Sequence, residues 1–216
     1  MNILKSILSD LKIADPKIKS SLDVGCGVGY FSKFLREEGF NVTAFDVRED
    51  NIVEAKKRVK NVEFFVDDIE DLINIKGDFD LVLCFGLLYH LENPLKALRN
   101  LVKLTKKYLI IESMIAPDNR PAALLVKEEQ ELDQSKNYVA LLPTEKLIVY
   151  FLKLLDFKVY KLNLNYYQPH IHSDFKSNLL KHKSRTIILA SRKEVCTKGI
   201  EEIKEKLLSD YLYTID

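Results

Sequence analysis

The sequence is poor in glycine and cysteine, has no tryptophan, and carries no excess charge of either sign. Its 216 residues include 7 glycines and 3 cysteines, and 33 basic residues stand against 32 acidic ones. A formal net charge of +1 excludes bulk electrostatic attraction as a means of holding a polyanion. No apolar run approaches the roughly 20 residues that a membrane-spanning helix needs, so we expect no transmembrane segment.

The cysteines argue against a disulfide framework. Cys26, Cys84 and Cys196 are scattered and form no C-x-x-C pair. The first residues, MNILKSILSDLK, mix charged and apolar side chains and lack the apolar core of a signal peptide. We therefore expect a cytoplasmic protein with reduced thiols, and a length of 216 residues suits a single domain, 1–216.

The first half of the chain alternates between short apolar runs and amphipathic ones. An amphipathic helix is predicted over residues 1–15, and strand-like runs then alternate with helix-like ones as far as YLIIES. Such alternation is typical of an α/β fold, in which helices cover both faces of a parallel sheet.

The second half is less regular. Residues 114–143 have no strong strand pattern, and their place after the fifth strand suggests a lid over a substrate; a helical decoration serving dimerisation is the alternative. Thr144 is a candidate N-cap for the next helix. The runs VYKLNLNYY and RTIILASRK are strand candidates, and a final helix is predicted over residues 198–210.

Three of the seven glycines lie within five residues, in the stretch SLDVGCGVGYFSKFL. Glycines between a strand and a helix permit positive φ angles and let a ligand approach the backbone closely. The dinucleotide fingerprint G-x-G-x-x-G fails in both registers, because Tyr30 and Ser32 stand where it requires glycine. The spacing present instead is Asp23-x-Gly25-x-Gly27-x-Gly29. This spacing excludes a pyrophosphate site of the dinucleotide type.

This segment resembles the first motif of class I S-adenosyl-L-methionine (SAM)-dependent methyltransferases, acid-x-Gly-x-Gly-x-Gly. The resemblance covers residues 22–112 well and extends loosely to 192. It implies a Rossmann-like fold: a seven-stranded, mostly parallel sheet with an antiparallel last strand, helices on both faces and an inserted helical lid. It also implies SAM as the cofactor, bound by Asp23, Gly25, Gly27, Gly29, Asp46, Asp68, Ile69 and Phe85.

The resemblance gives some of these residues separate roles. Asp46, at the end of VTAFD, would accept hydrogen bonds from the ribose hydroxyls, although a turn residue is the alternative. Asp68 and Ile69 would flank the adenine. Because Asp67 directly precedes Asp68, the sequence does not decide which of the two aspartates contacts the adenine, and either one also suits a helix N-cap. Phe85 would lie near the sulfonium group.

The segment GLLYHLENPLKAL is similar to a methyltransferase subgroup that completes a carboxymethyl modification of the tRNA wobble uridine. Those enzymes carry a sizeable domain ahead of the glycine loop, whereas about twenty residues precede it here. Residues 176–193 contain six Lys or Arg and no acid, which suits either a phosphate-facing patch or a solvated strand edge.

Candidate catalytic residues follow the fourth and fifth strands. His90 is the leading candidate for a general base because imidazole titrates near neutral pH; bracing of the following turn is the alternative. Tyr89 suits a hydrogen bond to the cofactor or the acceptor, or simple packing. Glu112 suits orientation of an acceptor group, or is a solvated strand end. His170 and His172 lack a third ligand with suitable spacing, so no metal is predicted.

These patterns predict a SAM-dependent methyltransferase that methylates an O or N atom of a small-molecule or glycan acceptor. Two alternatives remain open: a methyltransferase that modifies a tRNA base, and a non-catalytic SAM-binding partner subunit. A nucleic-acid partner is therefore kept as an alternative. We expect no membrane partner, and we expect a monomer or a homodimer. The sequence identifies neither the acceptor nor the acceptor atom.

Overall fold

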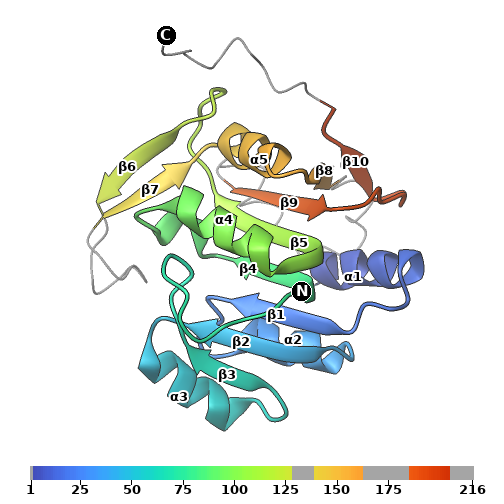
Figure 1. Cartoon of the computed structure of the whole chain (residues 1–216), viewed down its shortest axis with the longest axis vertical. Helices are drawn as coiled ribbons and strands as arrows, with labels where there is room; N and C mark the ends of the chain where they lie inside the picture. The colour runs from blue at the N-terminus through green and yellow to red at the C-terminus, as the bar shows by residue number, and fades with distance from the viewer. Residues whose placement is uncertain (1, 128–138, 163–184, 205–216) are drawn as a thin grey trace.

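The computed structural model describes residues 2–127, 139–162 and 185–204. Helices and strands alternate along most of this part of the chain (Figure 1). The elements, in chain order, are α1 (Asn2–Ala14), β1 (Ser20–Val24), α2 (Tyr30–Glu37), β2 (Asn41–Asp46), α3 (Glu49–Arg58), β3 (Glu63–Val66), β4 (Phe79–Phe85), the 3-10 helix η1 (Leu88–His90), α4 (Pro94–Leu104), β5 (Thr105–Met114), β6 (Ala123–Lys127), β7 (Val139–Pro143), α5 (Glu145–Leu154), β8 (Lys158–Leu162), β9 (Arg185–Ser191) and β10 (Ile200–Glu202).

Among the described residues, the central sheet has eight strands in the order β10-β8-β9-β5-β4-β1-β2-β3. Strands β1 to β5 pair in parallel, whereas β9 runs antiparallel to both β5 and β8. The mostly parallel sheet and its late antiparallel strand are confirmed. The predicted number of seven strands is one short, because β10 pairs antiparallel with β8 at the edge.

Strand β4 shows how the sheet is buried on both faces. Successive side chains of a strand point to opposite faces, and Leu81, Val82, Leu83 and Cys84 are all fully buried. Leu81 and Leu83 pack in one cluster with α1 and α2, while Val82 and Cys84 pack in another with α4 and α5. A strand that is apolar on both sides is typical of a parallel sheet between two helical layers.

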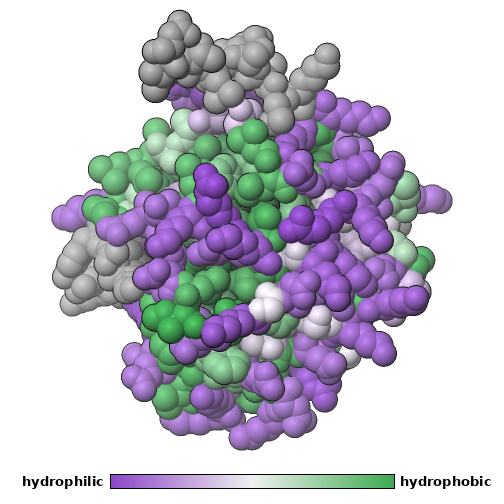
Figure 2. Space-filling model, viewed as in Figure 1, coloured by the Kyte–Doolittle hydropathy of each residue, from purple (hydrophilic) through white to green (hydrophobic). Residues whose placement is uncertain are grey.

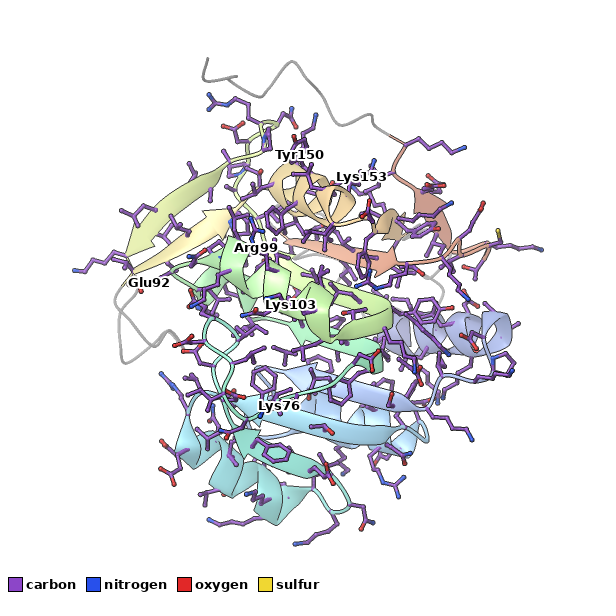
Figure 3. The ribbon with its side chains drawn as sticks, in the orientation of Figure 1. Lys76, Glu92, Arg99, Lys103, Tyr150 and Lys153 are labelled. Carbon is purple, nitrogen blue, oxygen red and sulfur yellow. The ribbon has the colours of Figure 1, made fainter. Side chains whose placement is uncertain are left out.

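Helices α4 and α5 lie side by side over one face of the sheet (Figures 1 and 3). Their apolar residues point inward, while the labelled Arg99 and Lys103 lie on the outer side of α4 (Figure 3). The guanidinium carbon of Arg99 lies 5.1 Å from the centre of the Phe151 ring, which connects the two helices. No helix among the described residues is both long and apolar enough to cross a membrane.

Where the sequence predicts a final helix over residues 198–210, the structure has strand β10 at Ile200–Glu202. The edge of β8 offers unpaired backbone groups, and β10 satisfies them over three residue pairs while Ile200 is buried. Within these three residues only Ile200 is apolar, so they carry no helical spacing of their own. Residues 205–210 lie outside the described part of the chain.

The predicted lid, residues 114–143, contains strands in its described part instead of helices. Strands β6 and β7 form a two-stranded antiparallel sheet, in which Ala123 pairs with Pro143 and Lys127 with Val139. Residues 128–138 are outside the description. Hydrophobic side chains reach the surface over β6 (Figure 2), where Leu125 is 72% exposed.

Thr144 fastens both ends of this hairpin to the start of α5. Its hydroxyl caps the helix by accepting a hydrogen bond from the Leu147 N–H at 3.1 Å, which confirms the predicted N-cap. The same oxygen accepts from the Ala122 N–H at 3.1 Å and donates to the Arg120 carbonyl at 2.7 Å. The chain entering β6 and the chain leaving β7 therefore meet at one side chain.

The sheet reverses its winding between β1 and β4. From β1 the chain continues to β2 and β3 on one side, then returns to place β4 and β5 on the other. In open α/β sheets, ligands bind outside the carboxyl ends of the strands at such a reversal. The loops that follow β1 and β4 are therefore where a site is expected.

Candidate functional site

All three glycines of the loop after β1 have left-handed backbone conformations. The φ angles are +68° at Gly25, +52° at Gly27 and +87° at Gly29. L-residues with a Cβ rarely adopt this region, which explains why the sequence places three of its few glycines here. Helix α2 begins at the residue after Gly29.

The three glycines face different surroundings. A Cβ on Gly25 would lie 2.9 Å from the Leu87 side chain, and one on Gly29 would lie 3.1 Å from Val59. A Cβ on Gly27 would meet no atom within 4 Å. A side chain would therefore crowd Leu87 at Gly25 and Val59 at Gly29, whereas Gly27 faces open space.

Asp46, the last residue of β2, holds this loop. Its Oδ2 accepts a hydrogen bond from the Gly27 N–H at 2.9 Å. Its Oδ1 accepts from the Arg48 N–H and from the Asn51 amide, each at 3.0 Å. A carboxylate has about four acceptor positions, so one position on Oδ2 is left after these three bonds.

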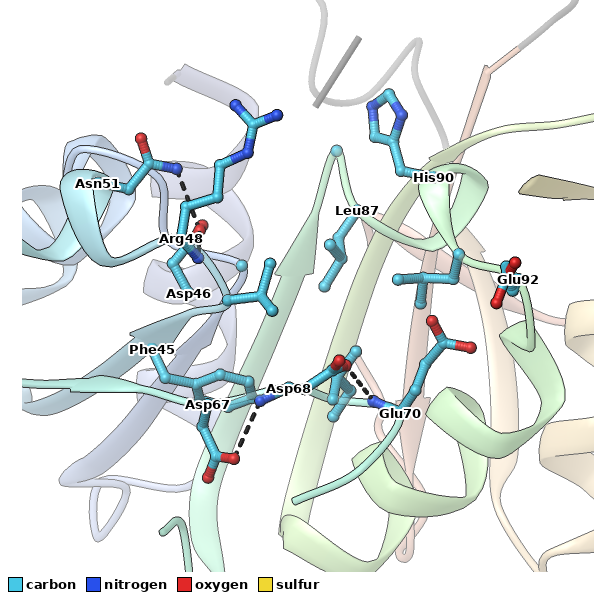
Figure 4. A pocket seen from close by; sticks show the side chains of 15 residues that line it. Phe45, Asp46, Arg48, Asn51, Asp67, Asp68, Glu70, Leu87, His90 and Glu92 are labelled. Carbon is cyan, nitrogen blue, oxygen red and sulfur yellow. Dashed lines mark hydrogen bonds between the residues drawn. The ribbon is translucent and has the colours of Figure 1, made fainter. Parts of the chain in front are cut away.

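A pocket opens between the ends of β1, β2, β3 and β4 (Figure 4). The empty space between these strand ends is about 670 Å³, including space open to solvent. The four sequence-predicted cofactor residues that line it are Gly25, Asp46, Asp68 and Ile69, and the predicted base His90 lines it as well.

Asp67 and Asp68 have different surroundings. The Asp67 carboxylate accepts four backbone hydrogen bonds of 2.8 to 3.0 Å, from residues 68, 73, 74 and 75. Burial raises the pKa of Asp67, but these donors together outweigh it, and the pKa lies below the ordinary value. Asp68 accepts from the Glu70 N–H at 2.9 Å and, in Figure 4, lies toward the pocket. Asp67 thus shapes the loop, and Asp68 is the better placed to meet a ligand.

Asp23 lies behind the loop and is absent from the pocket wall. It is 2% exposed, and its Oδ2 accepts a hydrogen bond of 2.6 Å from the Ser32 hydroxyl on α2. Burial raises the pKa of Asp23 to about 6; the Ser32 bond lowers it and the nearby Asp46 charge raises it. The carboxyl therefore resists ionisation while it fixes α2 against β1.

Asp23→Asn should change the pH dependence of stability. Because the folded-state pKa is raised, the folded wild type binds more protons than the unfolded chain between about pH 4 and 6, so its stability falls across that window as pH rises. An amide does not ionise. Relative to wild type, the free energy of unfolding of the variant should therefore rise by up to about 3 kcal/mol between pH 4 and 7. Urea denaturation at four pH values measures this, and parallel pH profiles would contradict it.

Glu112, at the carboxyl end of β5, is buried and bonded through both carboxylate oxygens. Oε1 accepts from Arg185 Nη1 at 2.6 Å, and Oε2 accepts from the Gly86 N–H at 3.1 Å. Arg185 Nη2 donates to the Tyr89 hydroxyl at 3.2 Å. Burial alone would lower the pKa of Arg185, but Glu112 holds it above the ordinary value. The structure thus brings Tyr89 and Glu112 together through a residue that the sequence analysis did not single out.

His90 and Phe85 occupy different places. The His90 ring stacks at a tilt on the Tyr89 ring, with 4.1 Å between centroids, and lines the pocket. Phe85 makes an edge contact with Phe31 at 5.0 Å and does not line this pocket. The predicted place of Phe85 beside a sulfonium group stays a prediction.

Sequence reasoning missed Arg48, Asn51 and Leu87, and it placed Arg185 only in the basic stretch 176–193, not in the site. Arg48 and Asn51 lie two and five residues after Asp46, so their nearness to the strand end was a usable signal. Leu87 follows β4 directly and lies against Gly25. Arg185 is 73 residues from Glu112, and only the strand order brings the two together.

The described ranges contain no group of three or more His, Cys, Asp or Glu side chains that could hold a metal ion. His170 and His172, for which the sequence offers no third ligand, lie outside the described residues, as does His182. Cys26, Cys84 and Cys196 are all free thiols.

Comparison with known families gives one match that covers more than half of the chain. Residues 3–151 match the model of a family described as a methyltransferase domain. The match runs from α1 into α5 and includes the glycine loop, Asp46 and His90.

Curated relatives match over a shorter stretch. The ubiquinone biosynthesis O-methyltransferase of Rickettsia bellii is 38% identical over 104 residues, which cover 46% of this chain and 39% of that protein. The enzyme of the same name from Coxiella burnetii is 36% identical over 94 residues, covering 42% of this chain and 40% of its own length. The match thus spans about two fifths of the length of these relatives.

Solved structures share the fold. Magnesium protoporphyrin IX methyltransferase from Synechocystis, crystallised with bound SAM, superposes with a TM-score of 0.59 at 17% identity, covering 88% of this chain and 78% of that one. A putative SAM-dependent methyltransferase from Listeria monocytogenes gives a TM-score of 0.62 at 15% identity, covering 82% of this chain and 92% of that one. These likenesses confirm the Rossmann-like architecture.

Proposed function

Because the chain belongs to the methyltransferase domain family, we propose that it transfers a methyl group from SAM to an oxygen or nitrogen atom of a small-molecule or glycan acceptor. The observation that carries the proposal is the pocket at the winding reversal, where Gly25, Asp46 and Asp68 meet His90. The O-methyltransferase names of the curated relatives favour oxygen as the acceptor atom.

The pocket fits SAM in three respects. Gly27 does not line the pocket itself, but the space in front of it, two residues from the lining residue Gly25, admits the close approach of a ligand to the backbone. The remaining acceptor position on Asp46 Oδ2 suits a ribose hydroxyl. Asp68 and Ile69 line the wall together and offer an acceptor for an adenine amino group beside an apolar side chain. We assign the adenine contact to Asp68, since Asp67 is engaged by the loop backbone.

When bound, SAM supplies an electrophilic methyl group, and the transfer leaves S-adenosyl-L-homocysteine (SAH). The protein has to bring the acceptor atom into line and exclude water, which contributes about 7 to 11 kcal/mol when the geometry is good. His90 accepts the proton that the acceptor atom loses. The β6–β7 hairpin covers the acceptor: the Leu141 N–H of β7 donates to the Leu91 carbonyl at 2.9 Å, directly after His90.

The test is transfer of a labelled methyl group from SAM to the small-molecule fraction of a cell extract. Wild type should bind SAM and SAH by calorimetry and should label a low-mass product. His90→Ala should lower kcat about 100-fold because it removes a base, and it should change the SAM affinity much less, since Gly25, Asp46 and Asp68 keep their places in the pocket. Full activity of this variant would remove His90 from the mechanism.

The other outcomes are equally informative. Failure to bind SAM or SAH would overturn the proposed function. Binding without transfer to any fraction would support the non-catalytic partner subunit instead. Binding of tRNA that weakens steeply with salt would support the RNA alternative, since phosphate contacts release counterions. The three free thiols lead us to place the protein in a reducing compartment, the cytoplasm.

A further inference from the structure

Arg185, the first residue of β9, is held in place on two sides. Its Nη1 donates to Glu112 at 2.6 Å and its Nη2 donates to the Tyr89 hydroxyl at 3.2 Å. Its guanidinium carbon lies 5.2 Å from the centre of the Tyr89 ring. A guanidinium has five N–H donors, and the contacts with the described residues use two of them. The side chain is thus fixed while it keeps donors for a further partner.

The position of Arg185 is at the ligand-binding edge of the sheet. Strand β9 runs antiparallel to β5, so its first residue, Arg185, pairs with Met114, the last residue of β5 and two residues after Glu112. Glu112 is bonded to Gly86 of the pocket wall, and Tyr89 stacks on His90. The side chain of Arg185 is 31% exposed, against 8% for Glu112. The guanidinium therefore lies beside the pocket and meets solvent.

We propose that Arg185 binds a carboxylate of the methyl acceptor, so that the protein selects anionic acceptors. This inference rests on the proposed function. Guanidinium and carboxylate groups match in a planar, two-bonded geometry, which favours Arg over Lys for this role. Both Glu112 oxygens already accept hydrogen bonds, so the buried acid anchors the guanidinium and leaves its other N–H groups to the acceptor.

The Tyr89 hydroxyl contributes to the same site. It accepts a hydrogen bond from Arg185 and has its own proton to donate. A carboxylate bound at Arg185 would receive that proton as a further hydrogen bond. Arg185 and Tyr89 then place the acceptor beside His90, whose ring stacks on Tyr89.

The test measures the affinity of the full chain, saturated with SAH, for paired probes. Benzoate, 3,4-dihydroxybenzoate and octanoate are each titrated beside their neutral amides by calorimetry. In wild type, at least one acid should bind about tenfold or more tightly than its amide, since a charge-assisted bond is replaced by a neutral one. Arg185→Met should abolish this preference, and Arg36→Met, which changes an exposed arginine on α2, should retain it.

Several results separate the possibilities. Should Arg185→Met fail to fold, Arg185→Lys replaces it, and its preference should fall because the planar fork is lost. If Arg185→Met lowers only the melting temperature or the SAH affinity, with an unchanged ratio of acid to amide, the pair with Glu112 is structural and the proposal is overturned. The absence of any acid preference in wild type overturns it as well. Failure of SAH itself to bind counts against the proposed function instead.

Discussion

Asp46→Asn is expected to weaken SAM binding by about 100-fold, corresponding to about 3 kcal/mol. The carboxylate accepts hydrogen bonds from Gly27, Arg48 and Asn51, and one acceptor position is left for the ribose. An amide replaces one acceptor oxygen by a donor that faces one of these N–H groups. Since bonds to charged groups each contribute about 1.5 to 3 kcal/mol, loss of the ribose contact and displacement of the loop together give this effect.

Calorimetric titration with SAM and SAH measures the change, and Asp50→Asn is the matched control. Asp50 is an exposed aspartate in the first turn of α3, and its substitution should leave the affinity within a factor of two or so of wild type. Urea denaturation should show a loss of about 1 to 3 kcal/mol for Asp46→Asn, because loop bonds are lost. Wild-type affinity in this variant would show that Asp46 serves the loop alone.

Gly27→Ala and Gly29→Ala are expected to fail in different ways. Both residues have positive φ, so each substitution strains the backbone by about 1 to 2 kcal/mol. At Gly29 the new Cβ would also lie 3.1 Å from Val59 and 3.3 Å from Ala55, and such overpacking adds about 1 to 3 kcal/mol. At Gly27 it would meet only the open space that we assign to the cofactor.

Gly29→Ala should therefore lose about 2 to 4 kcal/mol of stability, whereas Gly27→Ala should lose about half as much. For SAH affinity, measured at a temperature where both variants are folded, Gly27→Ala should be the more impaired variant. It should bind SAH about tenfold or more weakly than wild type, because the new Cβ moves the cofactor away from the backbone. Urea denaturation of the protein without ligand and calorimetry with SAH give the two numbers. Equal losses of stability, or wild-type binding by Gly27→Ala, would contradict the assignment.

The sequence predicts local features of the site and misses those that depend on strand order. The glycine loop and Asp46 can be predicted from the sequence because strand, turn and helix follow one another within a few residues. The ion pair of Arg185 and Glu112 is not, since it joins residues 73 apart. The assignment of the adenine contact to Asp68 instead of Asp67 needed the loop conformation. In that conformation four backbone N–H groups donate to the Asp67 carboxylate.

The elements that the sequence misjudged are short and lie at sheet edges. Strand β10 has three residues, and β6 and β7 have five each. Apolar spacing over such lengths does not separate a helix from a strand. The deciding factor is an available pairing partner, which β8 supplies to β10, and β6 and β7 supply to each other.

The hydrogen bonds of Thr144 to the chain that enters β6 allow the β6–β7 hairpin to vary as a unit. The Thr144 side chain binds the chain on both sides of β6 and β7, and the Leu141 N–H of β7 adds a second attachment at the Leu91 carbonyl. Doubling the length of a connecting segment costs only about 0.6 kcal/mol in closure entropy. Under the proposal that this hairpin covers the acceptor, its length and sequence can change without refolding the central sheet, so acceptor choice can diversify while the donor site stays constant.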